Sequence, residues 1–387
     1  MERKDRLMSL DALRGFDMLW IMGLANVVTN LCTLVGAKGC WLAQQMTHVE
    51  WHGFHHHDTI FPLFLFLAGA SWPFSFAGQV KRGYSTGRIV LRCLRRMVVL
   101  CLLGVFFFGF FRHLDFGKVR YDSILAHIGI CWCVAALVYM FVKSWKARLG
   151  IVAGLLVVHG LILGLCRAPD AAALLASTDP EVAKKVASYA AFGTDNFSFV
   201  GNIAGWIERT FVPGKLYEGI FDPDGVLAKI TGIALAMLGV FAGELLRQES
   251  LSGNRKTLVL AGAGVAAVAL TLGFAPLCPV NKKIWTSTFV LASAGYAYLM
   301  LALFYWIIDV KGLRKWAFVF MVVGMNSITI YLLMKFIWFG GVSKFFLEGV
   351  AALGNGAWNA VVIGVGQLVA EWLVLWYLYR KGTFLRV

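Results

Sequence analysis

Ten long apolar runs, separated by shorter polar stretches, divide the chain. Each run holds about 20 residues, which is the length that a helix needs to cross the hydrocarbon layer of a bilayer. Backbone groups in lipid must be satisfied within their own segment, so each run predicts a helix. The runs lie at roughly 16–35, 59–78, 90–111, 123–142, 149–166, 226–246, 257–276, 286–308, 318–337 and 358–379. The pattern predicts an all-α polytopic membrane protein with about ten transmembrane helices, in one domain over residues 1–387.

The composition excludes a soluble fold. Of the 387 residues, 59% are hydrophobic and only 15% are charged, and the mean hydropathy is +0.72. Soluble domains are nearer half apolar and one quarter charged. A water-soluble surface could not be built from so few charged residues, and a lipid bilayer is therefore an expected partner.

The net charge of +15 could indicate a nucleic-acid partner, but the basic residues follow the loops. Lys and Arg gather in alternate loops and at both ends, and the intervening loops are poorer in them, although Arg112, Lys118 and Arg120 weaken the contrast in one. The basic loops hold Arg3, Lys4 and Arg6; Lys81, Arg82 and Arg88; Lys143, Lys146 and Arg148; Arg247, Arg255 and Lys256; Lys311, Arg314 and Lys315; and Arg380, Lys381 and Arg386. This positive-inside pattern predicts cytoplasmic termini and no nucleic-acid partner.

One loop is long, at 167–225 between the fifth and sixth predicted helices, and the charge rule places it outside. Its 172–192 portion has the pattern of a short amphipathic helix, and it ends in the turn sequence "FDPDG". Cys40 and Cys278 fall in predicted outer loops and could pair, which the sequence leaves open. The first apolar run carries Asp17 and lacks a small-residue cleavage site, so we expect it to be retained.

Candidate chemistry gathers before the second apolar run, in "THVEWHGFHHHDTIFP" (47–62). Its ionisable residues are His48, Glu50, His52, His55, His56, His57 and Asp58. Histidine can act as a general base, an acyl acceptor or a metal ligand. A nearby acid can fix its tautomer. The plain alternative to catalysis is that this segment is a solvated loop at the membrane interface. A zinc site is another alternative, although the spacing matches no H-E-x-x-H pattern and three consecutive histidines cannot face one ion from a helix.

Further polar residues lie inside or beside the apolar runs, where they are costly and often functional. Asp11 and Arg14, at the inner end of the first run, could simply form a helix pair. Asn26, Glu244, Asn326 and Glu371 are isolated. Arg92, Arg95 and Arg96 at the inner end of the third run could be snorkelling anchors, or could cradle a phosphorylated cytosolic molecule.

Two outer loops carry polar groups at helix entries. Asp222 and Asp224 could bind a sugar amine or hydroxyls, or could be turn and capping residues. Asn281, Lys282 and Lys283 could receive an anionic glycan, or could cap the eighth predicted helix.

Seven stretches in order resemble one family, the heparan-α-glucosaminide N-acetyltransferase-like membrane acyltransferases, which includes bacterial members. They are "LDALRG" (10–15), H-x-x-W-x-G with D-x-x-F-P (48–62), "VR" with IL-x-x-IG (119–129), "DPDG" with LG-x-x-AG (222–243), P-V-N-K-x-x-W (279–285), "DVKG" (309–312) and GMNSI-x-x-Y (324–331). Together they span nearly the whole chain. The resemblance implies that acetyl passes from cytosolic acetyl-CoA to the amine of a terminal glucosamine across the membrane.

The resemblance also implies roles for residues. His48 matches the family's active-site histidine, as general base or transient acetyl carrier, and Asp58 matches its acid. Direct transfer is preferred because it needs one step fewer. Substrate-binding candidates are Trp51, His52, Asp222, Asp224, Asn281 and Asn326, with Asn326 and the two aspartates on the sugar side. Candidates for the CoA phosphates, chosen by charge, are Arg14, Arg92, Arg95 and Arg96.

Departures from the family pattern leave the identity of the acceptor sugar open. His52 stands where the family usually has Asn, and His127 stands where Arg is common. The large lumenal domain of the animal enzyme has no counterpart in this sequence. The resemblance implies a bacterial inner membrane and a homodimer as expectations. An amino-sugar transporter of the inner membrane is the alternative function.

Overall fold

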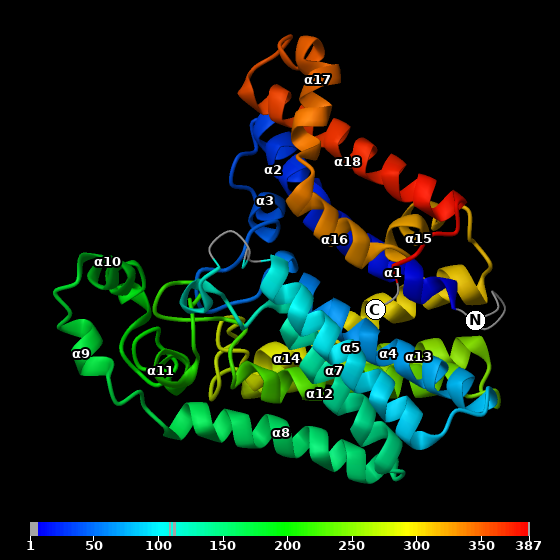
Figure 1. Ribbon diagram of the computed structural model, residues 1–387, viewed down its shortest axis with the longest axis horizontal. Coiled ribbons are helices and arrows are strands. Elements are labelled where there is room, and N and C mark those ends of the chain that lie inside the picture. Colours follow the sequence, from blue (N-terminus) through cyan, green and yellow to red (C-terminus); the bar gives the residue numbers. More distant parts are fainter. Residues whose placement is uncertain (1–6, 108–109, 111–113, 386–387) are drawn as a thin grey trace.

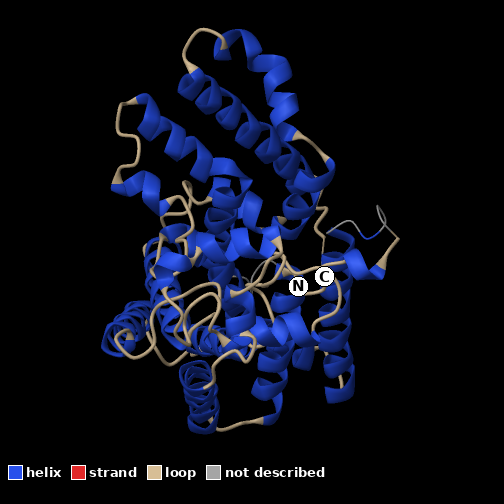
Figure 2. Ribbon diagram, turned by 90° about the vertical axis from the view of Figure 1, so that its left-hand side faces the viewer, coloured by secondary structure: helices blue, strands red, loops and turns tan. Residues whose placement is uncertain are grey.

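The computed structural model describes residues 7–107, 110 and 114–385. Over these ranges the chain folds into helices and loops, with isolated bridges but no strand (Figures 1 and 2). The predicted all-α class is confirmed. The basic residues Arg3, Lys4, Arg6, Arg112 and Arg386, and part of the run 90–111, lie outside the described residues.

Each predicted apolar run coincides with a helix or a helix pair. The long elements are α1 (Met8–Leu19), which continues through a π-turn (Trp20–Leu24) into α2 (Ala25–Leu34), α4 (Ile60–Lys81), α5 (Thr86–Phe107), α7 (Ile124–Phe141), α8 (Trp145–Leu165), α12 (Ala228–Arg247), α13 (Gly253–Phe274), α14 (Ser287–Tyr305), the pair α15 (Phe318–Gly324) and α16 (Ser327–Phe336), α17 (Phe339–Ala351) and α18 (Gly356–Arg380).

The number of spans is slightly below the expected ten. Among the described residues, eight spans are long and apolar enough to cross a membrane, and the pair α15–α16, bent by 69°, makes up to nine. The remaining run contains α5, whose first half carries Arg88, Arg92, Arg95 and Arg96. Charges in the hydrocarbon layer are costly, and this explains why α5 is not an apolar span along its whole length.

The centre of the bundle is the contact between α4 and α12. Added Cβ atoms at Gly239 and Gly243 would collide with the carbonyl oxygens of Phe66 and Ala70, and one at Gly69 would collide with that of Ala236. Small residues let membrane helices approach this closely, and the close approach supplies the dispersion contacts that hold them together. The position of α4 is therefore fixed along its length by α12.

A second close contact joins the first helix to the C-terminal part. Cβ atoms at Gly15 of α1 and Gly324 of α15 would collide with the carbonyl oxygens of Phe320 and Asp11, respectively. The helices α2, α16, α17 and α18 form the upper part of Figure 1, above the bundle that contains α4, α12 and α14. The first helix thus connects the two parts.

The long loop folds into a cap at the left of Figure 1. It contains α9 (Ala171–Leu175), α10 (Pro180–Ser188), a 3₁₀ turn (Ala190–Phe192) and α11 (Ile203–Phe211). The prediction of a single helix over 172–192 is wrong. Asp179 caps a new helix by accepting from the backbone N–H groups of Glu181 and Val182, and Pro180 occupies the first helical position.

An aromatic cluster joins this cap to the segment that carries His48. Trp51, 1% exposed, packs against Phe199, Phe221 and Tyr189. Its indole N–H donates to the carbonyl oxygen of Phe197 at 2.8 Å. The ring of Trp51 thus packs against apolar side chains of the cap, and its N–H is hydrogen-bonded to the cap backbone. These contacts hold the 47–55 segment under the cap.

The cap also buries a carboxyl group, that of Glu208 on α11. Its Oε1 accepts from the backbone N–H of Val226 at 2.6 Å, whereas its Oε2 has no hydrogen-bond partner among the described residues. Burial, with a further contribution from the charge of Asp122, raises the pKa of Glu208 to about 8. Glu208 is therefore mostly protonated at neutral pH in the folded protein and ionised in the unfolded chain.

This difference predicts a pH-dependent stability. The pKa of Glu208 is higher in the folded protein than in the unfolded chain, so folding takes up a proton. The contribution of protonated Glu208 to the stability of the folded protein is therefore lost as pH rises through about 8. Glu208→Gln cannot ionise. Between pH 6 and 9, the thermal midpoint of the purified wild type should fall relative to that of Glu208→Gln, as followed by tryptophan fluorescence. Parallel curves for the two proteins would contradict the assignment.

Candidate functional site

The residue at the centre of the site is Asp58, which starts α4. It lies in a 3₁₀ turn (His56–Thr59), and its carboxylate closes a capping box with His55. The Oδ2 atom accepts from the backbone N–H groups of His55 at 3.1 Å and Val49 at 3.4 Å. Asp58 is 1% exposed, so these bonds fix its orientation. Helix capping places the acid where the 47–55 segment folds back onto it.

His48 is the partner of the other carboxylate oxygen. Its Nδ1 lies 2.8 Å from Asp58 Oδ1, and its side chain is 53% exposed. An ionised carboxylate only accepts hydrogen bonds, so Nδ1 must carry the proton of this bond. The second nitrogen, Nε2, is then an acceptor and can serve as a base or a nucleophile. The structure therefore brings the two predicted catalytic residues together.

Lys282 completes this group from a distant part of the sequence. Its Nζ lies 3.0 Å from His48 Nδ1 and 3.4 Å from Asp58 Oδ1. Burial lowers the pKa of Lys282, and the charges of Asp58 and Asp224 oppose the shift. From the sequence, we expected this lysine to contact a glycan or to cap a helix. The contact with His48 was not predicted, because no local sequence pattern relates residue 282 to residue 48.

A cavity of about 810 Å³ leads away from these residues. At one end it is lined by His48, His57 and Lys282, and at the other by Leu7, Arg82 and Leu385. His57 and Arg82 flank the two ends of α4, whose 22 residues rise by about 33 Å. The cavity therefore follows α4 over a length comparable with the thickness of the hydrocarbon layer.

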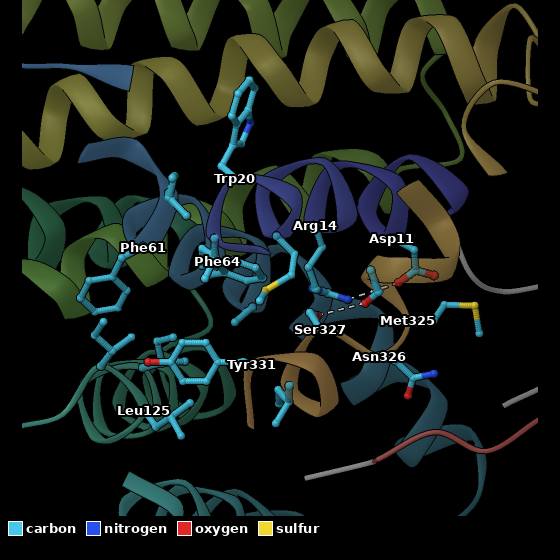
Figure 3. Close-up of a pocket in the computed structure, with 18 of the residues that line it drawn as sticks. Asp11, Arg14, Trp20, Phe61, Phe64, Leu125, Met325, Asn326, Ser327 and Tyr331 are labelled. Atoms are coloured by element: carbon cyan, nitrogen blue, oxygen red, sulfur yellow. Dashed lines mark hydrogen bonds and ion pairs between the residues drawn. The ribbon is translucent and has the colours of Figure 1, made fainter. Parts of the chain in front are cut away.

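Figure 3 shows part of the cavity wall, from Phe61 near the start of α4 to Asn326. The rings of Phe61, Phe64 and Tyr331 form an apolar stretch, and Arg14 points toward Asp11 at 3.2 Å. Arg14 also donates to Ser71 Oγ at 3.0 Å. Ser71 is near the middle of α4, so Arg14 lies about half-way along the cavity and Arg82 at its far end. An apolar channel that leads from His48 to cationic groups suits an elongated molecule with an anionic terminus.

The four predicted phosphate-binding arginines separate into two pairs. Arg14 and Arg96 line the cavity. Arg96 lies 4.1 Å above the ring of Trp132, and its Nε has no hydrogen-bond partner among the described residues. Arg92 and Arg95 are exposed outside the cavity lining, and Arg92 stacks on Tyr84 at 4.4 Å. The sequence alone could not distinguish these two pairs, because helical periodicity does not tell which face of α5 meets the cavity.

The two acids of the "DPDG" turn are engaged elsewhere. Arg120 donates to Asp222 at 2.6 and 2.7 Å and to Asp224 at 2.8 Å, and all three side chains are buried. Burial raises the pKa of Asp224 to about 6, with Arg120 opposing the shift. Neither aspartate lines the cavity. Their observed contacts hold the cap to the bundle rather than open toward a sugar.

The remaining substrate-binding candidates occupy different places. Trp51 is the buried aromatic anchor of the cap. His52 is half-buried, its Nδ1 lies 3.5 Å from Asn281 Nδ2, and burial lowers its pKa while Asp195 opposes the shift. Asn281 is fully buried and accepts from the backbone N–H of Ile284. Asn326 lines the cavity at the end away from His48, where its side chain donates to the carbonyl oxygen of Thr383.

Among the described residues, no group of three or more His, Cys, Asp and Glu side chains is arranged to hold a metal ion. Cys40 and Cys278 are both free thiols in the structure. His127, the other departure from the family pattern, is fully buried and lies 4.5 Å from the Trp285 ring, between ring centroids.

The fold and site define a class: a polytopic helical membrane protein with an acid–histidine pair at one end of a cavity along a spanning helix. No protein-family model matches the chain. The chain is similar to heparan-α-glucosaminide N-acetyltransferase of Homo sapiens, 28% identical over 84% of this chain and 52% of the relative. The corresponding protein of Mus musculus is 26% identical over 84% of this chain and 53% of the relative.

This similarity confirms the resemblance that the ordered motifs predicted. The chain spans about half the length of these curated relatives. The comparison therefore supports the relationship over most of this chain.

Proposed function

We propose that this protein is a transmembrane N-acetyltransferase, which carries acetyl from cytosolic acetyl-CoA to the amine of a terminal glucosamine or related amino sugar on the other side. The observation that carries the proposal is the cavity along α4, which joins the His48–Asp58 pair to the arginine-bearing end. The names of the two relatives support the reaction class.

The donor fits the cavity by its chemistry. Acetyl-CoA has an anionic, phosphorylated end and a long, flexible arm that ends in a thioester. Guanidinium groups bind phosphates, and Arg14 and Arg96 offer them in the cavity wall. The apolar stretch at Phe61, Phe64 and Tyr331 would contact the arm, which directs the thioester toward His48.

His48 would act as the general base. Because Asp58 holds the Nδ1 proton, Nε2 accepts a proton from the sugar amine as the nitrogen attacks the thioester carbonyl carbon. The C–S bond then breaks, and the thiolate takes that proton from Nε2. Acetylation of Nε2 followed by a second transfer is the longer route, and the same Asp58 contact would support it.

The sidedness rests on the basic loops. Lys81, Arg82 and Arg88 lie around the α4 C-terminus, at the end of the cavity remote from His48. The positive-inside rule assigns this end to the cytoplasm, where acetyl-CoA is found, and assigns His48 to the outer side. A bacterial inner membrane is the proposed location, and the half-buried His52, which lies beside Asn281, is a candidate to contact the acceptor sugar.

Loss of His48 tests the function directly. Purified wild type, supplied with labelled acetyl-CoA and a panel of amino sugars, should form an acetylated sugar. His48→Ala should lower the turnover by about 100-fold or more, because a general base contributes roughly that factor. Lys185→Met, which changes an ion-paired lysine of the cap outside the cavity lining, is the control and should retain activity within a few-fold. Absence of product with wild type, together with sugar uptake into proteoliposomes, would instead establish transport.

A second variant tests the orienting acid. Asp58→Asn keeps a capping side chain, but its amide can donate to Nδ1 and so favour the wrong tautomer of His48. We expect kcat to fall by about 100-fold or more, with the thermal midpoint little changed. Turnover within a few-fold of wild type would show that Asp58 does not orient the base.

A further inference from the structure

The position of Lys282 is set by the loop that carries it. The Asn281 N–H donates to Thr286 Oγ1 at 3.0 Å, which closes the loop on itself. The Gly53 N–H donates to the carbonyl oxygen of Val280 at 2.8 Å, which joins this loop to the one that carries His48. These contacts place the backbone of Lys282 next to the loop that carries His48, so that its side chain reaches the imidazole.

The charged and titratable groups around Lys282 come from four parts of the fold. His48 and Asp58 touch it, His57 packs on the His48 ring at 4.5 Å between centroids, and Asp224 and Lys283 act at longer range. His48 donates its Nδ1 proton to Asp58. A protonated Nδ1 cannot accept, so Lys282 does not donate a hydrogen bond to it. Its donors remain for Asp58 and for a group in the cavity that it lines.

We propose that Lys282 is a catalytic residue, which stabilises the negative charge that forms on the thioester oxygen during acetyl transfer at His48. This inference rests on the proposed function. At the His48 end the described cavity-lining residues include His48, His57 and Lys282. Of these three, Lys282 is the one amine, and the charges of Asp58 and Asp224 favour its ammonium form. Its Nζ lies 3.5 Å from His48 Nε2, the atom that must face the reacting amine.

The step needs no additional reactant. The amine nitrogen forms a bond to the carbonyl carbon while its proton moves to Nε2, and the carbonyl π pair moves onto oxygen. Lys282 donates a hydrogen bond to this oxyanion and keeps its own proton. When the carbonyl re-forms, the C–S bond breaks with its electron pair on sulfur, which takes the proton from Nε2. A fixed donor aimed at developing charge is an effective source of catalysis.

Lys282→Met is the test variant and Lys185→Met is its matched control. Lys185 forms an ion pair with Glu218 in the cap and does not line the cavity. For Lys282→Met we expect kcat to fall by about 100-fold or more, KM for acetyl-CoA to change less than about threefold, and the thermal midpoint to stay close to that of wild type. Lys185→Met should match wild type in all three measurements.

The contrary outcomes are distinct. If wild type and Lys282→Met acetylate the sugar at similar rates, the role of Lys282 is wrong while the proposed function stands. If the variant loses kcat in parallel with its thermal midpoint, Lys282 is structural. If Lys282→Met does not fold, Lys282→Gln replaces it under the same criteria. If wild type forms no product, the proposed function itself fails.

Discussion

The carboxylate of Asp58 is the interaction on which the site depends. One oxygen accepts from the backbone N–H groups of Val49 and His55 in the loop before α4, and the other meets His48 Nδ1 and Lys282. The same group therefore ends the loop, starts the membrane helix and fixes the tautomer of the histidine. Because Asp58 is buried, losing any of these partners would leave an unsatisfied charge, which is strongly unfavourable.

The second constraint is the close packing of α4 on α12. Glycines at their contact bring the two backbones together and leave the opposite side of α4 to line the cavity. A cavity that follows one helix from end to end can present a donor from one side of the membrane to a base at the other. Under the proposed function, the donor could reach His48 through this cavity without a large movement of the helices.

Much of this architecture could be predicted from the sequence. Apolar length located the helices, since lipid imposes a minimum span, and the ordered motifs indicated His48 and Asp58, ten positions apart. The contact of Lys282 with His48 joins residues 234 positions apart and depends on how two loops meet. The engagement of Asp222 and Asp224 by Arg120 has the same origin. The break at Asp179–Pro180 did have a local signal, because an acid before a proline is a helix start.

The most direct test of the account is the sidedness of the transfer. Wild type in sealed proteoliposomes would receive acetyl-CoA only outside and a trapped, membrane-impermeant glucosamine glycan only inside. The account predicts acetylated glycan inside the vesicles and free CoA outside, and no internal product with His48→Ala. Product formed only when donor and acceptor share one compartment would contradict a path along α4.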